Sequence, residues 1–181
     1  MLIDITWTLT KDTEELKAPE LIGHHGTHFD VMEKEFPLEY TKREGVIFDV
    51  SAVKDREIGL SDIDFNKVKE DMFIAFYSGF IEEEPYGTKK YFSGHPELSH
   101  ELIDALVEKG VSIIGLDFAG IRRGKEHIPK DRFCAERGVF VVENLCNLKT
   151  VLKNGENFTA HTYPMNYVGI TGLPCRVIVE V

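Results

Sequence analysis

The 181-residue sequence predicts an α/β fold, a single domain built on a mixed sheet with flanking helices. Two apolar runs, residues 72–77 and 139–142, have the length of strands that are buried on both faces of a sheet. A helical pattern over residues 99–110 lies between them. Strands that alternate with helices are typical of α/β proteins, and additional strands near both ends of the chain favour a mixed sheet.

The N-terminal half of the chain contains three predicted strands. Residues 2–7 alternate in polarity and include β-branched side chains, and the polar stretch 8–20 that follows is predicted to be a loop. Residues 46–53 again have the composition of a strand, and a turn then leads into a short helical stretch over 63–69. The buried type of strand at 72–77 comes next, before a long polar loop that contains glycine and proline.

The C-terminal half begins with the clearest helix. Ser99 is a favourable N-cap residue and Gly110 is a typical helix stop, with an apolar stripe between them. A strand over 111–116 follows directly. The remaining expected elements are a short helix ended by Gly138, a buried strand that leads to Glu143, and a last strand, at residues 131–137, 139–142 and 176–181.

Charge and composition argue against several classes of partner. The chain has 21 Lys and Arg against 31 Asp and Glu, a net charge of −10. Nonspecific binding to nucleic acid or to an anionic membrane is therefore not expected, because both need clustered cations. The longest apolar runs are far shorter than the roughly 20 residues that span a bilayer. The first residues lack the basic and apolar regions of a secretory signal, which favours a cytoplasmic protein.

Residues 1–181 are expected to form one domain. With 43% hydrophobic and 29% charged residues, the composition is that of an ordinary globular protein, and no repeat or linker interrupts the chain. The three cysteines, Cys134, Cys146 and Cys175, are widely spaced and form neither a CxxC pair nor an even set. They are predicted to be buried free thiols.

Residues 24–30, with the sequence HHGTHFD, place four candidate metal ligands within seven positions. Imidazole and carboxylate groups together suit Zn, Mn or Fe(II). In a straight strand His24 and His28 would lie about 13 Å apart, at roughly 3.3 Å per residue, which is too far to share one ion. Gly26 permits a bulge or turn that returns His24 towards His28. The alternative is a glycine turn that carries surface histidines.

A distant carboxylate would strengthen the metal hypothesis. Glu143 follows an apolar strand, and strand ends are where open α/β sheets build their sites. The alternative role for Glu143 is the capping of a helix or strand.

The motif His24-x-Gly26-Thr27-His28-x-Asp30 resembles the H-x-G-T-H-x-D signature of the cyclase family, which includes bacterial kynurenine formamidases (arylformamidases) and isatin hydrolases. Further segments resemble the family in the same order along nearly the whole chain. They are Ser61-Asp62-Ile63 leading to residues 72–77, Tyr91-Phe92 with His95-Pro96-Glu97-Leu98-Ser99, Ile114-Gly115-Leu116-Asp117, Glu143-Asn144-Leu145 with Asn147-Leu148, and Gly172-Leu173-Pro174-Cys175-Arg176-Val177.

The resemblance implies a metal-dependent hydrolase of the swivelling β/β/α type, which uses Zn or Mn and forms a homodimer or a larger homo-oligomer. Members of the family hydrolyse amide bonds such as that of N-formylkynurenine, a reaction of tryptophan catabolism. By position, His24, His28 and Asp30 match the first three metal ligands of the family. Glu143 matches the glutamate near the metal, and His25 would have a structural or supporting role.

The chain departs from the family pattern after Asp30. In the family a Pro and then a His follow the aspartate, in D-x-P-x-H, and this His is the proton shuttle, whereas Met32 and Lys34 stand at these positions here. A lysine near a divalent cation has its ammonium form disfavoured, so Lys34 could exchange protons or bind a substrate carboxylate. The alternative is a solvated lysine between two glutamates.

The distal metal ligand also differs. The family has a His twelve residues before the glutamate, and Asp131 occupies that position here. An aspartate ligand makes the set harder and more anionic, which favours Mn or Mg without excluding Zn. His127, four residues upstream, is the competing candidate, and Asp131 is preferred because it requires no gap.

These observations together predict a hydrolase that acts on a small-molecule amide or cyclic amide with a metal-activated water. The expected metal ligands are His24, His28, Asp30, Asp131 and Glu143, and Lys34 and Glu143 are the candidates for proton handling. Because the shuttle histidine is missing, a lactam or cyclic imide is as plausible a substrate as N-formylkynurenine. The alternative function is a catalytically inactive member of the same fold that binds a metal or another ligand.

Overall fold

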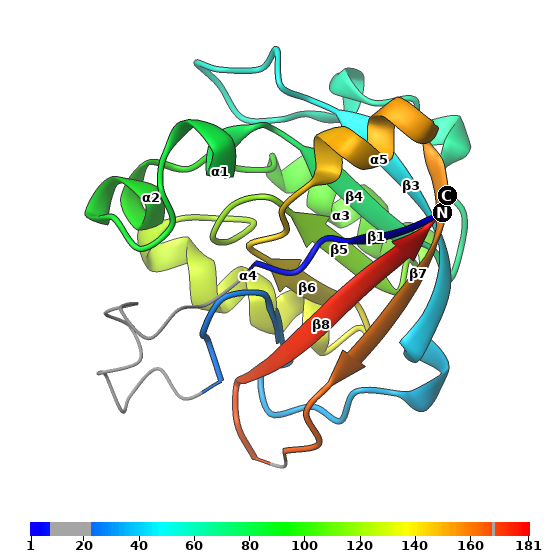
Figure 1. The fold of residues 1–181 in the computed structure, drawn as a ribbon. Helices are drawn as coiled ribbons and strands as arrows, with labels where there is room; N and C mark the ends of the chain where they lie inside the picture. The colour runs from blue at the N-terminus through cyan, green and yellow to red at the C-terminus, as the bar shows by residue number, and fades with distance from the viewer. Residues whose placement is uncertain (8–22, 168) are drawn as a thin grey trace.

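The computed structural model describes residues 1–7, 23–167 and 169–181 (Figure 1). In these ranges eight strands form one sheet in the order β1-β8-β2-β6-β5-β4-β3-β7, and β7 also pairs with β8, so the sheet closes on itself. The strands are β1 (Leu2–Asp4), β2 (His28–Asp30), β3 (Lys42–Asp49), β4 (Phe73–Tyr77), β5 (Ile113–Leu116), β6 (Phe140–Glu143), β7 (Asn157–Pro164) and β8 (Gly172–Glu180). The α-helices are α1 (Phe80–Glu83), α2 (Lys89–Gly94), α3 (His100–Lys109), α4 (His127–Ala135) and α5 (Leu148–Asn154). Short 3-10 turns occur at Leu38–Thr41, Leu60–Asp62, Phe65–Lys67 and Gly124–Glu126.

The sheet is mixed, as the sequence predicts. β3, β4, β5 and β6 are successive parallel neighbours, so their carboxyl ends lie at one edge of the sheet. The pairings of β1, β2, β7 and β8 are antiparallel. Parallel neighbours need a crossover connection, and α1 to α3 supply it between β4 and β5, while α4 supplies it between β5 and β6. The predicted α/β fold with flanking helices is confirmed.

Two hydrophobic clusters pack on opposite faces of the sheet. The first lies inside the closed sheet, where Phe29 of β2, Phe73 of β4 and Val151 of α5 are buried together. The second lies on the outer face of β3 to β6, where it is covered by Leu106 of α3 and Cys134 of α4. The strands between the two clusters are buried on both sides, which explains their continuous apolar sequence.

The helix and the buried strands that define the fold class are present. α3 begins after Ser99, whose Oγ accepts a hydrogen bond from the Leu102 N–H at 3.1 Å. It ends at Gly110, which has a φ of 75° and donates its N–H to the carbonyls of Leu106 and Val107. β4 and β6 fall on the two predicted apolar runs and are buried along their whole length.

Three elements begin earlier than predicted. β3 begins at Lys42 because it pairs with β7, and β8 begins at Gly172 because it pairs with both β2 and β7. Those partners are distant in the sequence, so the local pattern does not show them. α4 begins at His127 rather than at residue 131.

Other elements were missed. The polar loop after β4 contains the short helices α1 and α2, and α5 and β7 had no predicted counterpart. The helical stretch predicted over 63–69 is reduced to the 3-10 turn Phe65–Lys67. The loop predicted over 8–20 lies outside the described residues.

The three cysteines are free thiols, as predicted. Cys134 is buried, but the prediction of burial is wrong for Cys146 and Cys175, which are partly exposed. Among the described residues, no helix is long and apolar enough to cross a membrane.

His95 is a buried imidazole at the end of α2. Its ring stacks on Phe118, with 5.7 Å between ring centroids, and its Nδ1 donates a hydrogen bond to the Pro96 carbonyl at 2.7 Å. Burial, together with the nearby charge of His127, lowers the pKa of His95 from 6.5 to about 4. The folded protein therefore keeps this ring neutral over a pH range in which the unfolded chain would protonate it.

The pH dependence of stability tests this assignment. Between pH 6.5 and pH 4 the unfolded state binds more protons at His95, so stability falls as the pH falls, by up to about 3 kcal/mol from this group. We expect His95→Gln to reduce that loss, measured as the free energy of unfolding in denaturant at several pH values. His100→Gln, at an exposed histidine, is the control. An identical pH dependence in the two variants would contradict the assignment.

Candidate metal centre

The register between β2 and β6 places the first polar groups of the site. His28 is paired with Glu143, and Asp30 is paired with Val141. Because side chains alternate along a strand, His28, Asp30 and Glu143 point to the same side, while Phe29 points into the core inside the sheet. All three polar groups are buried.

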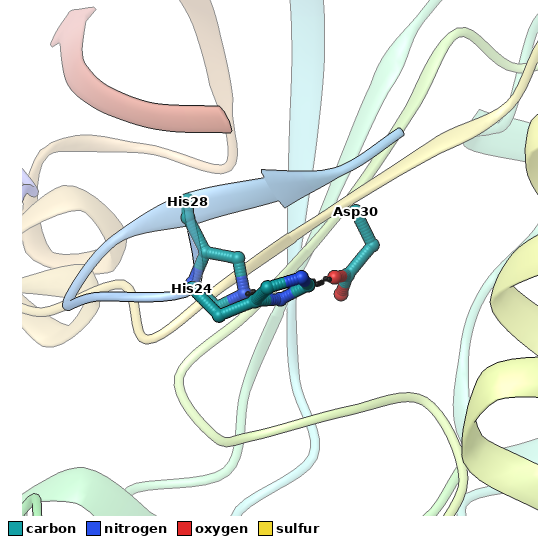
Figure 2. A group of neighbouring side chains, drawn as sticks. All are labelled: His24, His28 and Asp30. Carbon is teal, nitrogen blue, oxygen red and sulfur yellow. Dashed lines mark hydrogen bonds and ion pairs between the residues drawn. The ribbon is translucent and has the colours of Figure 1, made fainter. Parts of the chain in front are cut away.

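A turn at Gly26 adds a second histidine. Gly26 has a φ of 60°, the left-handed conformation that glycine adopts without strain, so the bend expected from the sequence is present. His24 Nδ1 consequently lies 3.1 Å from His28 Nε2 and 3.2 Å from Asp30 Oδ1 (Figure 2). The two rings meet edge to face. Three donors from a seven-residue segment therefore converge on one point.

Helix α4 supplies further donors from the opposite side. His127 and Asp131 lie one helical turn apart and share a face of α4. His127 Nε2 lies 3.1 Å from Asp131 Oδ2 and 3.3 Å from Glu143 Oε1. One ligand atom each from Asp30, His127 and Glu143 falls within 4.8 Å of the others, as is also true of His24, His28 and Asp30. Asp30 is common to both groups.

The outer nitrogens of the first two imidazoles are engaged by the protein. His28 Nδ1 bonds the Gly26 carbonyl at 2.9 Å, and because a carbonyl only accepts, Nδ1 carries the proton. His24 Nε2 lies 2.8 Å from Thr171 Oγ1. The remaining nitrogens, His24 Nδ1 and His28 Nε2, both face the cluster. This is the arrangement of metal-binding histidines, whose second nitrogen is held by a hydrogen bond.

Several buried oxygens at the centre have no hydrogen-bond partner among the described residues. They are Asp30 Oδ2, Glu143 Oε1, and both carboxylate oxygens of Asp131. Leaving a buried charged oxygen without a hydrogen bond is costly, even where an imidazole such as that of His127 lies within ion-pair distance, unless a cation or an added proton compensates for it. A divalent cation between these oxygens and the imidazole nitrogens would satisfy them, so the residues present fit a metal.

The pKa values of the clustered carboxyl and imidazole groups are shifted by their burial and by one another. Burial and the charge of Asp30 raise the pKa of both Asp131 and Glu143. Burial alone would lower the pKa of His28 and His127, but the adjacent carboxylates raise these values to about 9 and about 11. The pKa of Asp30 is lowered in spite of its burial, because His24 and His28 both bond to it. Without a metal the histidines therefore compensate for the carboxylates only in part.

Lys34 and His25 lie differently from these six residues. After β2 the backbone turns through Met32 and Glu33, which have φ values of 46° and 68°, and Lys34 is exposed beyond the turn. It lines a cavity of about 570 Å³ together with Phe36, and none of the six donor residues lines that cavity. His25 is half-buried, and its Nδ1 has no hydrogen-bond partner in the described ranges.

Comparison with protein families identifies the chain. Residues 3–122 match the model of a family described as Putative cyclase, and this match covers more than half of the sequence. The protein belongs to this cyclase family. The resemblance to the cyclase family is thereby confirmed, and the matched range contains the histidine motif and the segments up to Asp117. A comparison of this chain with curated proteins found no match.

Known structures share the fold of this cyclase-family chain. A protein described as a potential metal-dependent hydrolase with cyclase activity has a TM-score of 0.79 and 23% identity, with 99% of this chain and 96% of that chain covered. A "predicted metal-dependent hydrolase" from Bacillus stearothermophilus has a TM-score of 0.78 and 22% identity, with coverage of 99% and 97%. Isatin hydrolase A from Labrenzia aggregata has a TM-score of 0.77 and 18% identity, with coverage of 99% and 93%. At these identities the likeness shows the fold.

Replacing Asp131 tests two effects of this residue: its effect on the stability of the metal-free protein, and its contribution to the stabilisation by a bound metal. We expect Asp131→Asn to stabilise the metal-free protein at pH 7 by about 1 kcal/mol, because it removes one of three crowded carboxylates. The same variant should gain less stability than the wild type when Mn²⁺ is added.

The measurement is denaturant unfolding in EDTA and in excess Mn²⁺. Asp55→Asn, in an exposed loop, is the control and should change neither value. A metal-free Asp131→Asn protein that is less stable than the wild type would contradict the electrostatic explanation.

Proposed function

We propose that the protein is a metal-dependent hydrolase with its active site at the cluster between β2, β6 and α4. The observation that carries the proposal is the convergence of three imidazoles and three buried carboxylates, with four carboxylate oxygens left without a hydrogen-bond partner among the described residues. Membership of the cyclase family and the fold shared with metal-dependent hydrolases support it.

We propose two overlapping sets of ligands. His24, His28 and Asp30 form the first, as the sequence predicts, and Asp30, His127 and Glu143 form the second. On α4, His127 lies close to both Asp131 and Glu143. The sequence offered His127 and Asp131 as alternative distal ligands, and we propose that both face the metal. Mixed imidazole and carboxylate donors suit Zn or Mn, and the additional carboxylate of Asp131 favours Mn.

When bound, such a metal supplies a water of lowered pKa and polarises the carbonyl of the substrate. A base must also take the proton of the attacking water and return it to the departing amine nitrogen. Glu143 is our candidate for this transfer, because its Oε1 is buried at the centre of the cluster without a hydrogen-bond partner in the described chain. The proton transfer expected of Lys34 stays a prediction. Its side chain is exposed beyond the turn after β2.

The proposed substrate is a small amide or cyclic amide, of the kind that arylformamidases and isatin hydrolases cleave. Isatin hydrolases are among the structures that share this fold, and isatin is itself a cyclic amide. The assembly into homodimers or larger oligomers and the cytoplasmic location expected from the sequence remain predictions.

Metal content is the first test. We expect wild-type protein purified without chelator to contain about one Mn or Zn per chain by elemental analysis, and His28→Ala to lose it, because His28 presents Nε2 to the cluster. His161→Ala, a histidine on β7 outside the cluster, should keep its metal. An absence of metal in the wild type, even after reconstitution with Mn²⁺ or Zn²⁺, would overturn the proposal.

Turnover is the second measurement. The metal-loaded protein should hydrolyse at least one of N-formylkynurenine, formanilide and isatin, and His28→Ala should reduce kcat/KM by at least about 10²-fold. Bound metal without hydrolysis of any of these amides would favour the alternative, an inactive family member that binds metal or another ligand.

A further inference from the structure

Asn144 is a buried amide beside the cluster that is not one of the six donors. It follows Glu143 directly and has a φ of 60°, the left-handed conformation in which asparagine is tolerated better than most other residues. Its N–H bonds the Phe118 carbonyl at 3.3 Å. The side chain of Asn144 reaches the histidine segment, where its amide contacts Gly26.

Both ends of the Asn144 amide are engaged. Its Nδ2 donates a hydrogen bond to the Gly26 carbonyl at 2.8 Å, and its Oδ1 accepts one from the Tyr91 hydroxyl at 2.7 Å. The Gly26 carbonyl determines which way the amide faces, because it only accepts and a flipped amide would present an oxygen to it. The Tyr91 hydroxyl then donates to Oδ1.

The Gly26 carbonyl is the acceptor that holds His28. It receives His28 Nδ1 at 2.9 Å as well as Asn144 Nδ2 at 2.8 Å. The hydrogen bond to Nδ1 keeps the ring with Nε2 directed into the cluster. Asn144 therefore acts on the site through a backbone oxygen that it shares with His28.

The surrounding contacts hold the turn at Gly26 in place. The Gly26 N–H donates to the Tyr86 hydroxyl at 2.7 Å. Thr27 Oγ1 donates to the Asn144 carbonyl at 2.8 Å and accepts from the Trp7 N–H at 2.7 Å. The end of β6 and the start of β2 are thus joined through backbone and side chain of the same asparagine.

We propose that Asn144 is a positioning residue, which orients the Gly26 carbonyl and through it the His28 imidazole, and that Tyr91 holds the Asn144 amide in place by donating to its Oδ1. This role rests on the proposed metal-dependent function. Removal of hydrogen-bonding groups that orient a metal ligand typically weakens metal binding 10–100-fold. Asn144→Ala should therefore lower the affinity for Mn²⁺ or Zn²⁺ by about this factor.

Asn147 offers a matched control. It also has a left-handed φ, of 59°, and its Nδ2 also donates to a backbone carbonyl, that of Asp4 at 2.8 Å, but it lies on the exposed start of α5. Asn147→Ala should leave the metal dissociation constant within about twofold of the wild type. Tyr91→Phe keeps the ring and the Asn144 amide, and should weaken metal binding several-fold, less than Asn144→Ala.

The experiment combines metal titration with proton NMR of the His28 ring. In the metal-free wild type we expect a slowly exchanging, downfield Nδ1–H resonance from the hydrogen bond to Gly26. In Asn144→Ala we expect this proton to exchange faster. The comparison is made at a temperature where unfolding curves show both proteins folded. If the role of Asn144 were purely structural, Asn144→Ala would lower the free energy of unfolding and leave the Nδ1–H exchange and the metal affinity unchanged.

The outcomes separate this inference from the proposed function. If the wild-type protein binds neither Mn²⁺ nor Zn²⁺, the proposed function is wrong. The Nδ1–H exchange of the metal-free wild type and of Asn144→Ala would still test the role of Asn144. Equal metal affinity and equal Nδ1–H exchange in Asn144→Ala and Asn147→Ala would overturn the positioning role. If Asn144→Ala does not fold, Tyr91→Phe decides by the same two readouts.

Discussion

The antiparallel pairing of β2 with β6 is the contact on which the rest of the site depends. It sets His28 opposite Glu143 and leaves Phe29 fully buried inside the closed sheet. A shift of register by one residue would turn Phe29 outward and carry His28 and Asp30 into the apolar core. Burial of one aromatic ring and pairing with β8 on the other side therefore maintain the geometry of the polar cluster.

The cluster opposes the stability of the fold that holds it. Asp30, Asp131 and Glu143 are all buried, and their mutual repulsion and desolvation are relieved only in part by the three histidines. A bound cation would supply the missing positive charge, and its binding energy would then be part of the folding energy. Function and stability are in this way coupled through the same oxygens.

The sequence was most informative where the interaction is local. The spacing from His24 to Asp30 and the freedom of Gly26 allowed a turn that gathers three donors, with surface histidines as the alternative, and the structure has the gathered arrangement within one bend of the chain. The boundaries of β3 and β8, and the existence of β7, depend on strands far away in the sequence. The pattern of residues along one segment does not predict which distant strands will pair with it.

The sequence by itself indicated the α/β class and the cyclase family, because the order of segments along the chain carries both. It also indicated the histidine turn and the helix from Ser99 to Gly110, because these depend on residue types at short spacing. Only the tertiary structure decided how α4 faces β6. Its earlier start at His127 places His127 and Asp131 on one helical face, a relation that the order of residues left as a choice. It also revealed Asn144, whose contact with Gly26 joins residues 118 positions apart. Long-range packing brings such groups together, and periodicity does not encode it.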